Sequence, residues 1–307
     1  MAETTTAPRP PANFRAGPGP ASRFFGDVLL PGGAKAVLWL WVGFNVLLLL
    51  WVLVTSLKTD SEVFDFLSAP SRLAWENFTR AWADSGFGRA FANTVVYAVA
   101  TAATSVLFAA PAAYGIARSG RKAGGWLLVF FSLGMTIPHQ IVLVPYVVMN
   151  AQLDTLMVDW VTGWWDQRIF VVAVSVAWQI PFSVFVLEGY FRSLPSELEE
   201  AATIDGASRW TTFREVMLPL AGPAVRTVFV LNLITAWNET LLVLVLINDP
   251  AKSTLGPTLL NTFGSLQNQS SWGVLFAGVA VVTLPILAVF VWTAGRILEG
   301  VTAGVDK

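Results

Sequence analysis

Acidic and basic side chains gather in one short stretch of a chain that is otherwise strongly apolar. Hydrophobic residues make up 55% of the 307 residues and charged residues only 13%, yet residues 197–220 read ELEEAATIDGASRWTTFREVMLPL. Runs of Val, Leu and Phe flank this stretch on both sides. Because its charges could not be buried in lipid without partners, we expect it to lie outside a bilayer. It is either a solvated hairpin or a surface that docks onto another protein.

The stretch carries the signals of two short helices joined by a turn. Ser196 and Glu199 have the spacing of a capping box at the start of the first helix. Asp205-Gly206 predicts where this helix stops. The second helix is expected to begin near Ser208 and to end before Pro219. Its apolar face would be formed by Trp210, Phe213 and Met217.

Several kinds of chemistry are excluded by composition. The chain has no Cys, which rules out thiolate ligands and cysteine nucleophiles, and its one His, His139, argues against a His-ligated metal centre. Gly115–Lys122 (GIARSGRK) imitates a phosphate-binding loop, but it has Arg121 where that motif has Lys and follows a membrane helix. A net charge of -1 gives no basic surface for nucleic acid.

The elements that must position the charged stretch are membrane helices. A span needs about 20 mostly apolar residues, and every backbone polar group within it must be satisfied, which in lipid favours a helix. The sequence therefore predicts an all-α integral membrane protein with six transmembrane helices, and the charged stretch connects the fourth to the fifth. The predicted spans are Val37–Leu57, Phe91–Ala117, Trp126–Met149, Ile169–Tyr190, Ala224–Ile247 and Gly273–Ala294.

The ends of the spans can be oriented by their basic residues. Most of the 19 Lys and Arg residues fall on the side that includes both termini and the charged stretch, which predicts that this side is cytoplasmic. Residues 1–34, rich in Ala, Thr, Pro and Gly, are expected to form a disordered basic tail. In the first outer loop, a short interfacial helix is expected around Trp75 and Trp82.

Polar side chains inside the predicted spans need a reason, because they are costly in lipid. Pro138 and Pro145 predict a kink in the third span, where Gln140 is the better pathway candidate and His139 a structural, hydrogen-bonded residue. The fifth span places an AWNET segment near its middle. Interhelical bracing and direct substrate contact both remain open for these groups. The pathway candidates are Gln140, Trp178, Asn232, Trp237, Asn238 and Glu239.

The spacing within the charged stretch resembles the EAA motif of ABC importer permeases. The motif positions are Glu200, Ala201, Ala202, Gly206, Val216, Leu218 and Pro219, with Val216 in place of the usual Ile. The FRSLP and IDGAS segments, the Trp-Asn-Glu triplet and the Pro-His-Gln run are similar to the carbohydrate branch of that family. The resemblance covers nearly all of residues 35–307, which would form the permease domain.

The resemblance implies that the stretch is a coupling-helix pair that sits in a cleft of a separate ATP-binding subunit. Ala201, Ala202 and Gly206 would allow two backbones to approach closely, while Glu200 offers a carboxylate to an arginine of the partner. The expected docking residues are Glu200, Ala201, Ala202, Asp205, Gly206, Arg209 and Pro219. ATP and Mg²⁺ would be bound by the ATP-binding dimer, and this chain would hold no cofactor and no catalytic residue.

The same resemblance implies further partners in a prokaryotic plasma membrane. They are a second permease chain, an extracytoplasmic solute-binding protein and a carbohydrate substrate. The loop after the fifth span would reach the binding protein through Thr258, Asn261 and Ser271, or would be a plain connector. An importer of the same architecture for an amino acid, phosphate or osmolyte is the alternative. An ion-coupled carrier or membrane enzyme would need an acid pair or metal set in the spans, which the sequence lacks.

Overall fold

The computed structural model describes residues 30–66, 68–160, 166–268 and 271–302, and within these ranges the secondary structure is helical, with no strand. Four helices are long and apolar enough to cross a membrane, and two bent helix pairs bring the number to six if each pair is one span. The predicted all-α membrane fold is therefore confirmed. The four long helices are α2 (Leu30–Ser56), α4 (Phe87–Ala117), α7 (Gln167–Ser193) and α14 (Trp272–Thr302).

Helix α2 begins at Leu30, before the predicted start of the first span. Most of the predicted basic tail, residues 1–29, lies outside the described residues. The chain divides into two compact units at Val52, and the following paragraphs concern the unit that begins at Leu53.

The third predicted span is kinked, as its prolines indicate. It consists of α5 (Arg121–Gly134), the 3-10 turn η3 (His139–Val142) and α6 (Leu143–Trp160), and the two helical arms meet at 73°. Pro138 lies in the break, with an extended backbone. Pro145 falls in the first turn of α6, where a missing N–H costs little. The break is therefore at the first proline alone.

The fifth predicted span is not one continuous helix, contrary to the prediction. Helix α11 (Gly222–Trp237) ends at the Trp of the AWNET segment, and α12 (Leu241–Leu246) begins after three intervening residues. The carboxylate of Glu239 accepts the backbone N–H of Leu242 at 2.8 Å. An acidic side chain that bonds the first amides of a helix favours a new helix start, which explains the break.

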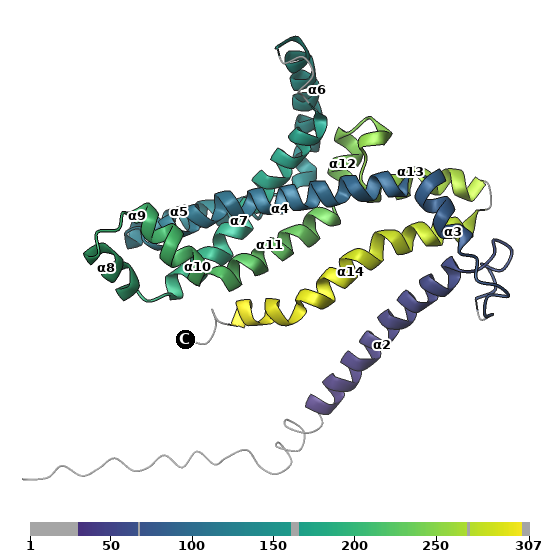
Figure 1. Cartoon of the computed structure of the whole chain (residues 1–307), viewed down its shortest axis with the longest axis horizontal. Helices are drawn as coiled ribbons and strands as arrows, with labels where there is room; N and C mark the ends of the chain where they lie inside the picture. The colour runs from purple at the N-terminus through teal and green to yellow at the C-terminus, as the bar shows by residue number, and fades with distance from the viewer. Residues whose placement is uncertain (1–29, 67, 161–165, 269–270, 303–307) are drawn as a thin grey trace, which may run out of the picture. The chain divides into compact units, whose positions relative to one another are not determined.

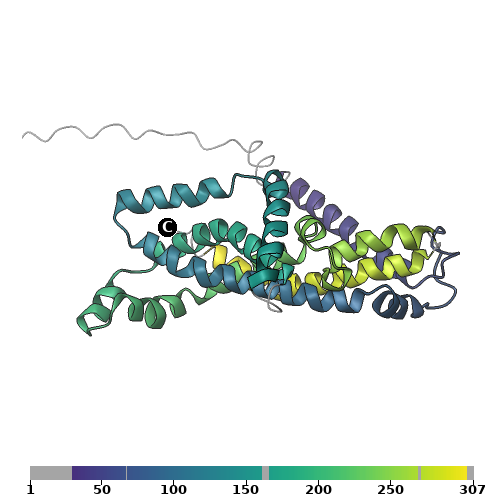
Figure 2. The same cartoon turned by 90° about the horizontal axis from the view of Figure 1, so that it is seen from above.

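Helices α4, α7 and α11 form the core of this unit. Helix α4 lies along α7, α11 packs against both, and α14 lies beside α11 (Figures 1 and 2). Small residues of α4 allow the close approach, because without a hydrophobic drive in lipid, helix association depends on tight van der Waals packing. The buried cluster contains Ala109, Ala110, Ala113, Ile116, Val184, Leu187, Phe191, Phe213, Met217, Ala221, Ala224 and Val228.

The charged stretch and the two outer loops lie at opposite ends of this helix bundle. The charged stretch forms α8 (Glu197–Ile204) and the short helices α9 (Arg209–Thr212) and α10 (Leu218–Leu220) at one end, and α3 and α13 lie at the other (Figure 1). The short helix expected in the first outer loop is present as α3 (Glu76–Thr79) and the π-helical turn η2 (Arg80–Asp84). The loop after the fifth span contains a 3-10 turn, η5 (Pro250–Lys252), and the 14-residue helix α13 (Leu255–Asn268).

The first turn of α14 is packed tightly against the first outer loop. A Cβ atom added to Gly273 would lie 2.9 Å from the carbonyl oxygen of Lys58. The Gly273 N–H donates to a carboxylate oxygen of Asp60 at 2.8 Å. Asn77, which donates to the carbonyl oxygens of Ser56 and Lys58, closes the same contact. The glycine thus fixes where the last span meets the outer loop.

Gly273→Ala should lower the free energy of unfolding by about 1–3 kcal/mol, because the backbone carbonyl cannot move away as a flexible side chain could. Gly264→Ala is the matched control, since a Cβ there meets nothing within 4 Å in helix α13. The thermal stability of the purified protein in detergent measures both. Equal stability of the two variants would contradict this account of the contact.

Candidate functional site

The first helix of the charged stretch, α8, ends in a left-handed turn at Gly206. Gly206 has φ +82°, and the N–H of Ala207 donates to the carbonyl of Ala202 at 2.9 Å. The N–H of Gly206 donates to the carbonyl of Thr203 at 3.0 Å. This is a Schellman cap, which strongly favours glycine at the left-handed position. The predicted helix stop is confirmed.

The predicted capping box is wrong. Ser196 has helical backbone angles (φ −71°, ψ −21°), and its side chain makes no capping hydrogen bond. Glu199 instead points toward helix α4, where its carboxylate contacts Arg118 at 2.5 Å. The sequence pattern could not reveal this competing partner, which is 81 residues away.

Helix α8 exposes an apolar face beside its carboxylates. Leu198 and Ile204 are 38% and 86% exposed, and Ala201 lies between them on the same face, at the i, i+3, i+6 spacing. Glu200 and Gly206 are also exposed, and a Cβ at Gly206 would meet nothing within 4 Å. Exposed apolar groups rimmed by charges are typical of a protein–protein contact. The remaining predicted docking residues are exposed (Asp205, Arg209, Pro219) or half-buried (Ala202).

The second half of the charged stretch is helical to Leu220. It comprises α9 (Arg209–Thr212), the π-helical turn η4 (Phe213–Met217) and α10 (Leu218–Leu220), and Ser208 caps it by accepting the N–H of Thr211. The predicted end before Pro219 is therefore wrong. The wide π turn comes directly before α10, and such a turn relieves the clash that the proline ring would cause in a continuous α-helix.

Aromatic packing anchors this second half to the membrane helices. Phe213 and Met217 are buried, and the Phe213 ring lies 5.2 Å from Tyr114 of α4 and 6.3 Å from Phe191 of α7, measured between ring centroids. The predicted apolar face is thus confirmed for these two residues. Trp210 lies 5.3 Å from the Phe213 ring but remains 62% exposed.

An ion pair anchors the first half. The Arg118 guanidinium, at the end of α4, donates to Glu199 at 2.5 Å and to the carbonyl of Leu194 at 3.2 Å. Both charged side chains are only about one-fifth exposed. A partly buried, hydrogen-bonded ion pair is held more firmly than a surface pair. We refer to residues 194–220, fixed by this pair and by Phe213, as the docking hairpin.

A small cavity lined by several polar residues, which we call the polar cavity, lies between the kinked third span and the broken fifth. It has a volume of 120 Å³, and its walls include Tyr97, His139, Ser175, Trp178 and Glu239. The His139 ring meets Trp178 edge to face with centroids 5.5 Å apart, and its Nε2 lies 3.7 Å from Glu239 Oε2. The cavity therefore combines an aromatic face, a carboxylate and an imidazole, the side-chain types that bind hydroxylated rings.

Only two of the six pathway candidates, Trp178 and Glu239, line this cavity. Asn232 is buried and donates to Ser183 of α7 at 2.8 Å. The Trp237 indole donates to the carbonyl of Val282 at 3.1 Å. These two residues brace α11 against its neighbours. Gln140 and Asn238 are exposed and do not line the cavity.

The sequence favoured Gln140 as the pathway residue, but His139 is the residue that lines the cavity. The choice between Gln140 and His139 depended on which side chain the 3-10 turn after Pro138 rotates inward, and composition does not encode that rotation. Tyr97 and Ser175, which hydrogen-bond one another at 2.7 Å across α4 and α7, were also missed. Both look like ordinary interior residues of apolar helices.

The predicted contacts in the outer loop separate into two groups. Thr258 and Asn261 line an open pocket of 360 Å³ together with Asp84 and Arg89. Ser271 is buried, and Arg80 donates to its hydroxyl at 3.3 Å. Ser271 is therefore a structural residue in this chain and is not offered to a partner, contrary to the prediction. In the described part of the chain, no group of three His, Asp or Glu side chains is placed to hold a metal.

Residues 105–297 match the family described as the binding-protein-dependent transport system inner membrane component. The chain belongs to this family. The diacetylchitobiose uptake system permease protein of Streptomyces coelicolor is 33% identical over 274 residues, which cover 88% of this chain and 87% of that protein. The trehalose transport system permease protein of Mycobacterium tuberculosis is 31% identical over 281 residues, 90% of this chain and 99% of that protein.

Two solved structures share the fold of this chain. A chain of a bacterial ABC transporter involved in import of the acidic polysaccharide alginate superposes with a TM-score of 0.70 and 23% identity, covering 90% of this chain and 98% of that chain. A second alginate transporter structure, in complex with an alginate pentasaccharide-bound periplasmic protein, gives a TM-score of 0.63. This chain is thus a multi-pass membrane permease component of a binding-protein-dependent transport system.

Arg118→Gln should loosen the docking hairpin without unfolding the bundle, because Phe213 and Met217 still hold its second half. We expect the backbone amides of α8 to exchange with deuterium about fivefold faster, as for a loss of about 1 kcal/mol of local stability. Arg226→Gln, an exposed arginine on α11, is the control. Unchanged exchange in α8 of the Arg118 variant would show that the ion pair does not hold the hairpin.

Proposed function

We propose that this chain is one of two transmembrane permease subunits of an ATP-driven importer for a carbohydrate. The observation that carries the proposal is the docking hairpin, which is exposed on one face and fixed to two membrane helices on the other. The permeases of Streptomyces coelicolor and Mycobacterium tuberculosis, which serve diacetylchitobiose and trehalose uptake, support the substrate class. The second subunit would be a related permease chain.

The energy would come from a separate dimer of ATP-binding subunits. The nearest phosphate-loop imitation, Gly115–Lys122, runs from the last turns of α4 into the first of α5, without the strand that such a loop follows. ATP and Mg²⁺ would therefore bind the partner, and this chain would perform no catalysis. The exposed Ala201 and Ile204 would seat against that subunit, while Glu200 pairs with a basic side chain there.

Movement of the ATP-binding subunits would reach the spans through two contacts. The Arg118–Glu199 ion pair connects the docking hairpin to α4, and Phe213 and Met217 connect it to the buried cluster of α4 and α7. The breaks at η3 and at residues 238–240 divide the third and fifth spans, so the segments beyond them can tilt separately. Alternation between inward-open and outward-open arrangements would then follow ATP binding and hydrolysis.

The substrate would pass the polar cavity. Trp178 can stack on the apolar face of a pyranose, and Glu239 and His139 can bond its hydroxyls. Since the cavity holds only 120 Å³, it is a contact point on a path that opens further during transport. At the opposite end from the docking hairpin, the pocket formed by Thr258 and Asn261 would face the solute-binding protein.

The placement in the membrane follows from the charge distribution. The docking hairpin and both termini would be cytoplasmic, because most basic residues lie on their side of the spans. Helix α13 would then be extracytoplasmic, which agrees with its position at the other end of the helix bundle from the hairpin (Figure 1).

Glu200→Lys should reduce ATP-dependent uptake at least about tenfold, the effect of losing about 1.4 kcal/mol or more at the docking interface. Gly206→Trp should do the same, since it puts a bulky ring on the exposed turn and strains a left-handed backbone. The assay is sugar uptake by cells that express the whole importer. Membrane levels of each variant should equal those of the unaltered chain.

Glu76→Lys is the control, because Glu76 is a half-buried carboxylate, paired with Arg72, in helix α3 at the other end of the helix bundle. Normal uptake by both hairpin variants would refute docking at this surface. Purification of the intact complex, followed by mass spectrometry, tests the partners directly, since an ATP-binding subunit and a second permease should be recovered with this chain.

A further inference from the structure

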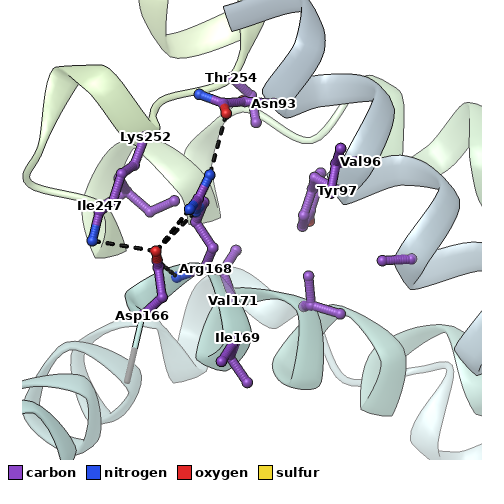
Figure 3. Close-up of a pocket in the computed structure, with 12 residues that line it drawn as sticks. Asn93, Val96, Tyr97, Asp166, Arg168, Ile169, Val171, Ile247, Lys252 and Thr254 are labelled. Carbon is purple, nitrogen blue, oxygen red and sulfur yellow. Dashed lines mark hydrogen bonds and ion pairs between the residues drawn. The ribbon is translucent and has the colours of Figure 1, made fainter. Parts of the chain in front are cut away.

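A second and larger cavity opens at the end of α4 and α7 that is remote from the docking hairpin. Its volume is 460 Å³, within the range of about 300–1,000 Å³ that is typical of small-molecule sites. The walls come from the first turns of α7, from α4 and from the segment around η5 (Figure 3). None of the residues that line the polar cavity belongs to it except Tyr97.

The rim of this cavity is charged. Arg168 donates to Asp166 at 2.8 Å and to Asn93 at 3.3 Å, and the Lys252 ammonium lies 3.3 Å from the same carboxylate (Figure 3). Partial burial of Asp166 raises its pKa, but hydrogen bonds from Arg168 and Lys252 outweigh this and lower the pKa to about 2. One ionised carboxylate is thus shared by two cations, which remain 47% and 34% exposed.

Below the rim the cavity is apolar. Val96 and Ile169 line it and are exposed, and Ala100 and Val172 line it and are half-buried. The Tyr97 hydroxyl is already bonded to Ser175, while the buried hydroxyl of Thr254, which follows η5 and also lines the cavity, has no hydrogen-bond partner. A sugar would leave several hydroxyls unpaired against these walls, which is costly. The cavity therefore does not suit the proposed transport substrate.

The order of polar and apolar groups follows the membrane normal. Asp166 precedes the first residue of the span α7, which places the rim at the boundary between lipid and water. Val172 lies six residues further along α7, about 9 Å deeper at 1.5 Å per residue, which is hydrocarbon depth. The site thus offers cations at headgroup level and an apolar channel directly beneath them.

We propose that this cavity binds one glycerophospholipid, with its phosphodiester at Arg168 and Lys252 and one acyl chain along Val96, Ala100 and Ile169. Phosphate oxygens accept from guanidinium and ammonium groups, and apolar burial of the chain adds about 0.8 kcal/mol per methylene. Asp249, which caps η5 from outside the cavity, offsets part of the positive charge. The site therefore suits a headgroup with a single phosphate. This inference requires only that α7 spans the membrane, and it is independent of what the chain transports.

The test is native mass spectrometry of the purified complex, delipidated and then titrated with two lipids that share the same acyl chains. One is phosphatidylglycerol and the other is monoglucosyl diacylglycerol, which has no phosphate. We expect phosphatidylglycerol to bind more tightly, and Lys252→Gln to weaken it about fivefold, as for a lost charge-assisted hydrogen bond at a partly exposed site. Ala100→Phe, which fills the channel, should weaken both lipids.

Arg72→Gln is the matched control, because Arg72 is an exposed, ion-paired arginine in the first outer loop and should leave both affinities unchanged. Unaltered phosphatidylglycerol binding in both cavity variants would overturn the proposal. If Ala100→Phe does not fold, unaltered binding by Lys252→Gln overturns it. Release of phosphatidylglycerol by inorganic phosphate, with monoglucosyl diacylglycerol retained, would make this a free-phosphate site. Loss of the second permease from Ala100→Phe, with lipid binding intact, would make it a subunit interface. Either result overturns the proposal.

Discussion

The connection between the docking hairpin and the spans is the constraint on which the rest of the structure depends. A hairpin that only extended into water could bind a partner but could not transmit force. Here its first helix is held by Arg118, at the end of α4, and its second half is held by Phe213 and Met217 against α4 and α7. The exposed face remains available because those contacts use the opposite face of each helix.

Hydrogen bonds inside the bundle hold α4, α7 and α11 together, whereas the third and fifth spans are each interrupted by a break. Tyr97 with Ser175, and Asn232 with Ser183, bond α4 and α11 to α7 in the buried centre. In lipid such bonds contribute about 0.6–2 kcal/mol each, and several together hold the helices as one body. The kinked third span and the broken fifth meet at the polar cavity, which borders this braced region at Tyr97 and Ser175. Polar residues of similar appearance therefore have two roles, one structural and one at the candidate pathway.

Much of this architecture is predictable because the bilayer leaves few choices. Long apolar runs must become helices, so four spans follow from the sequence, and Pro138 indicates the kink of another. The left-handed turn at Gly206 is equally local, since it depends on the residue itself. These features need no knowledge of neighbours.

The predictions that failed depended on contacts between distant residues, on one local hydrogen bond or on a local rotation. The Ser196–Glu199 capping box does not form, because Glu199 pairs with Arg118 at the end of helix α4. The middle of the fifth span became a helix start because Glu239 bonds a backbone amide, and Ser271 was buried by Arg80. His139 rather than Gln140 faces the cavity because of a short 3-10 turn. None of these outcomes changes the hydropathy pattern from which the spans were predicted.

The central claim is that the exposed face of α8 seats on an ATP-binding subunit at the cytoplasmic surface. The chain has no Cys, so Ala201→Cys introduces a unique thiol at the middle of that face. In inverted membrane vesicles, a thiol-to-amine cross-linker that cannot cross the membrane should join residue 201 to the ATP-binding subunit, with no such product in right-side-out cells. Cross-linking to an extracytoplasmic protein, or full labelling of the thiol in the assembled complex without any cross-link, would contradict the account.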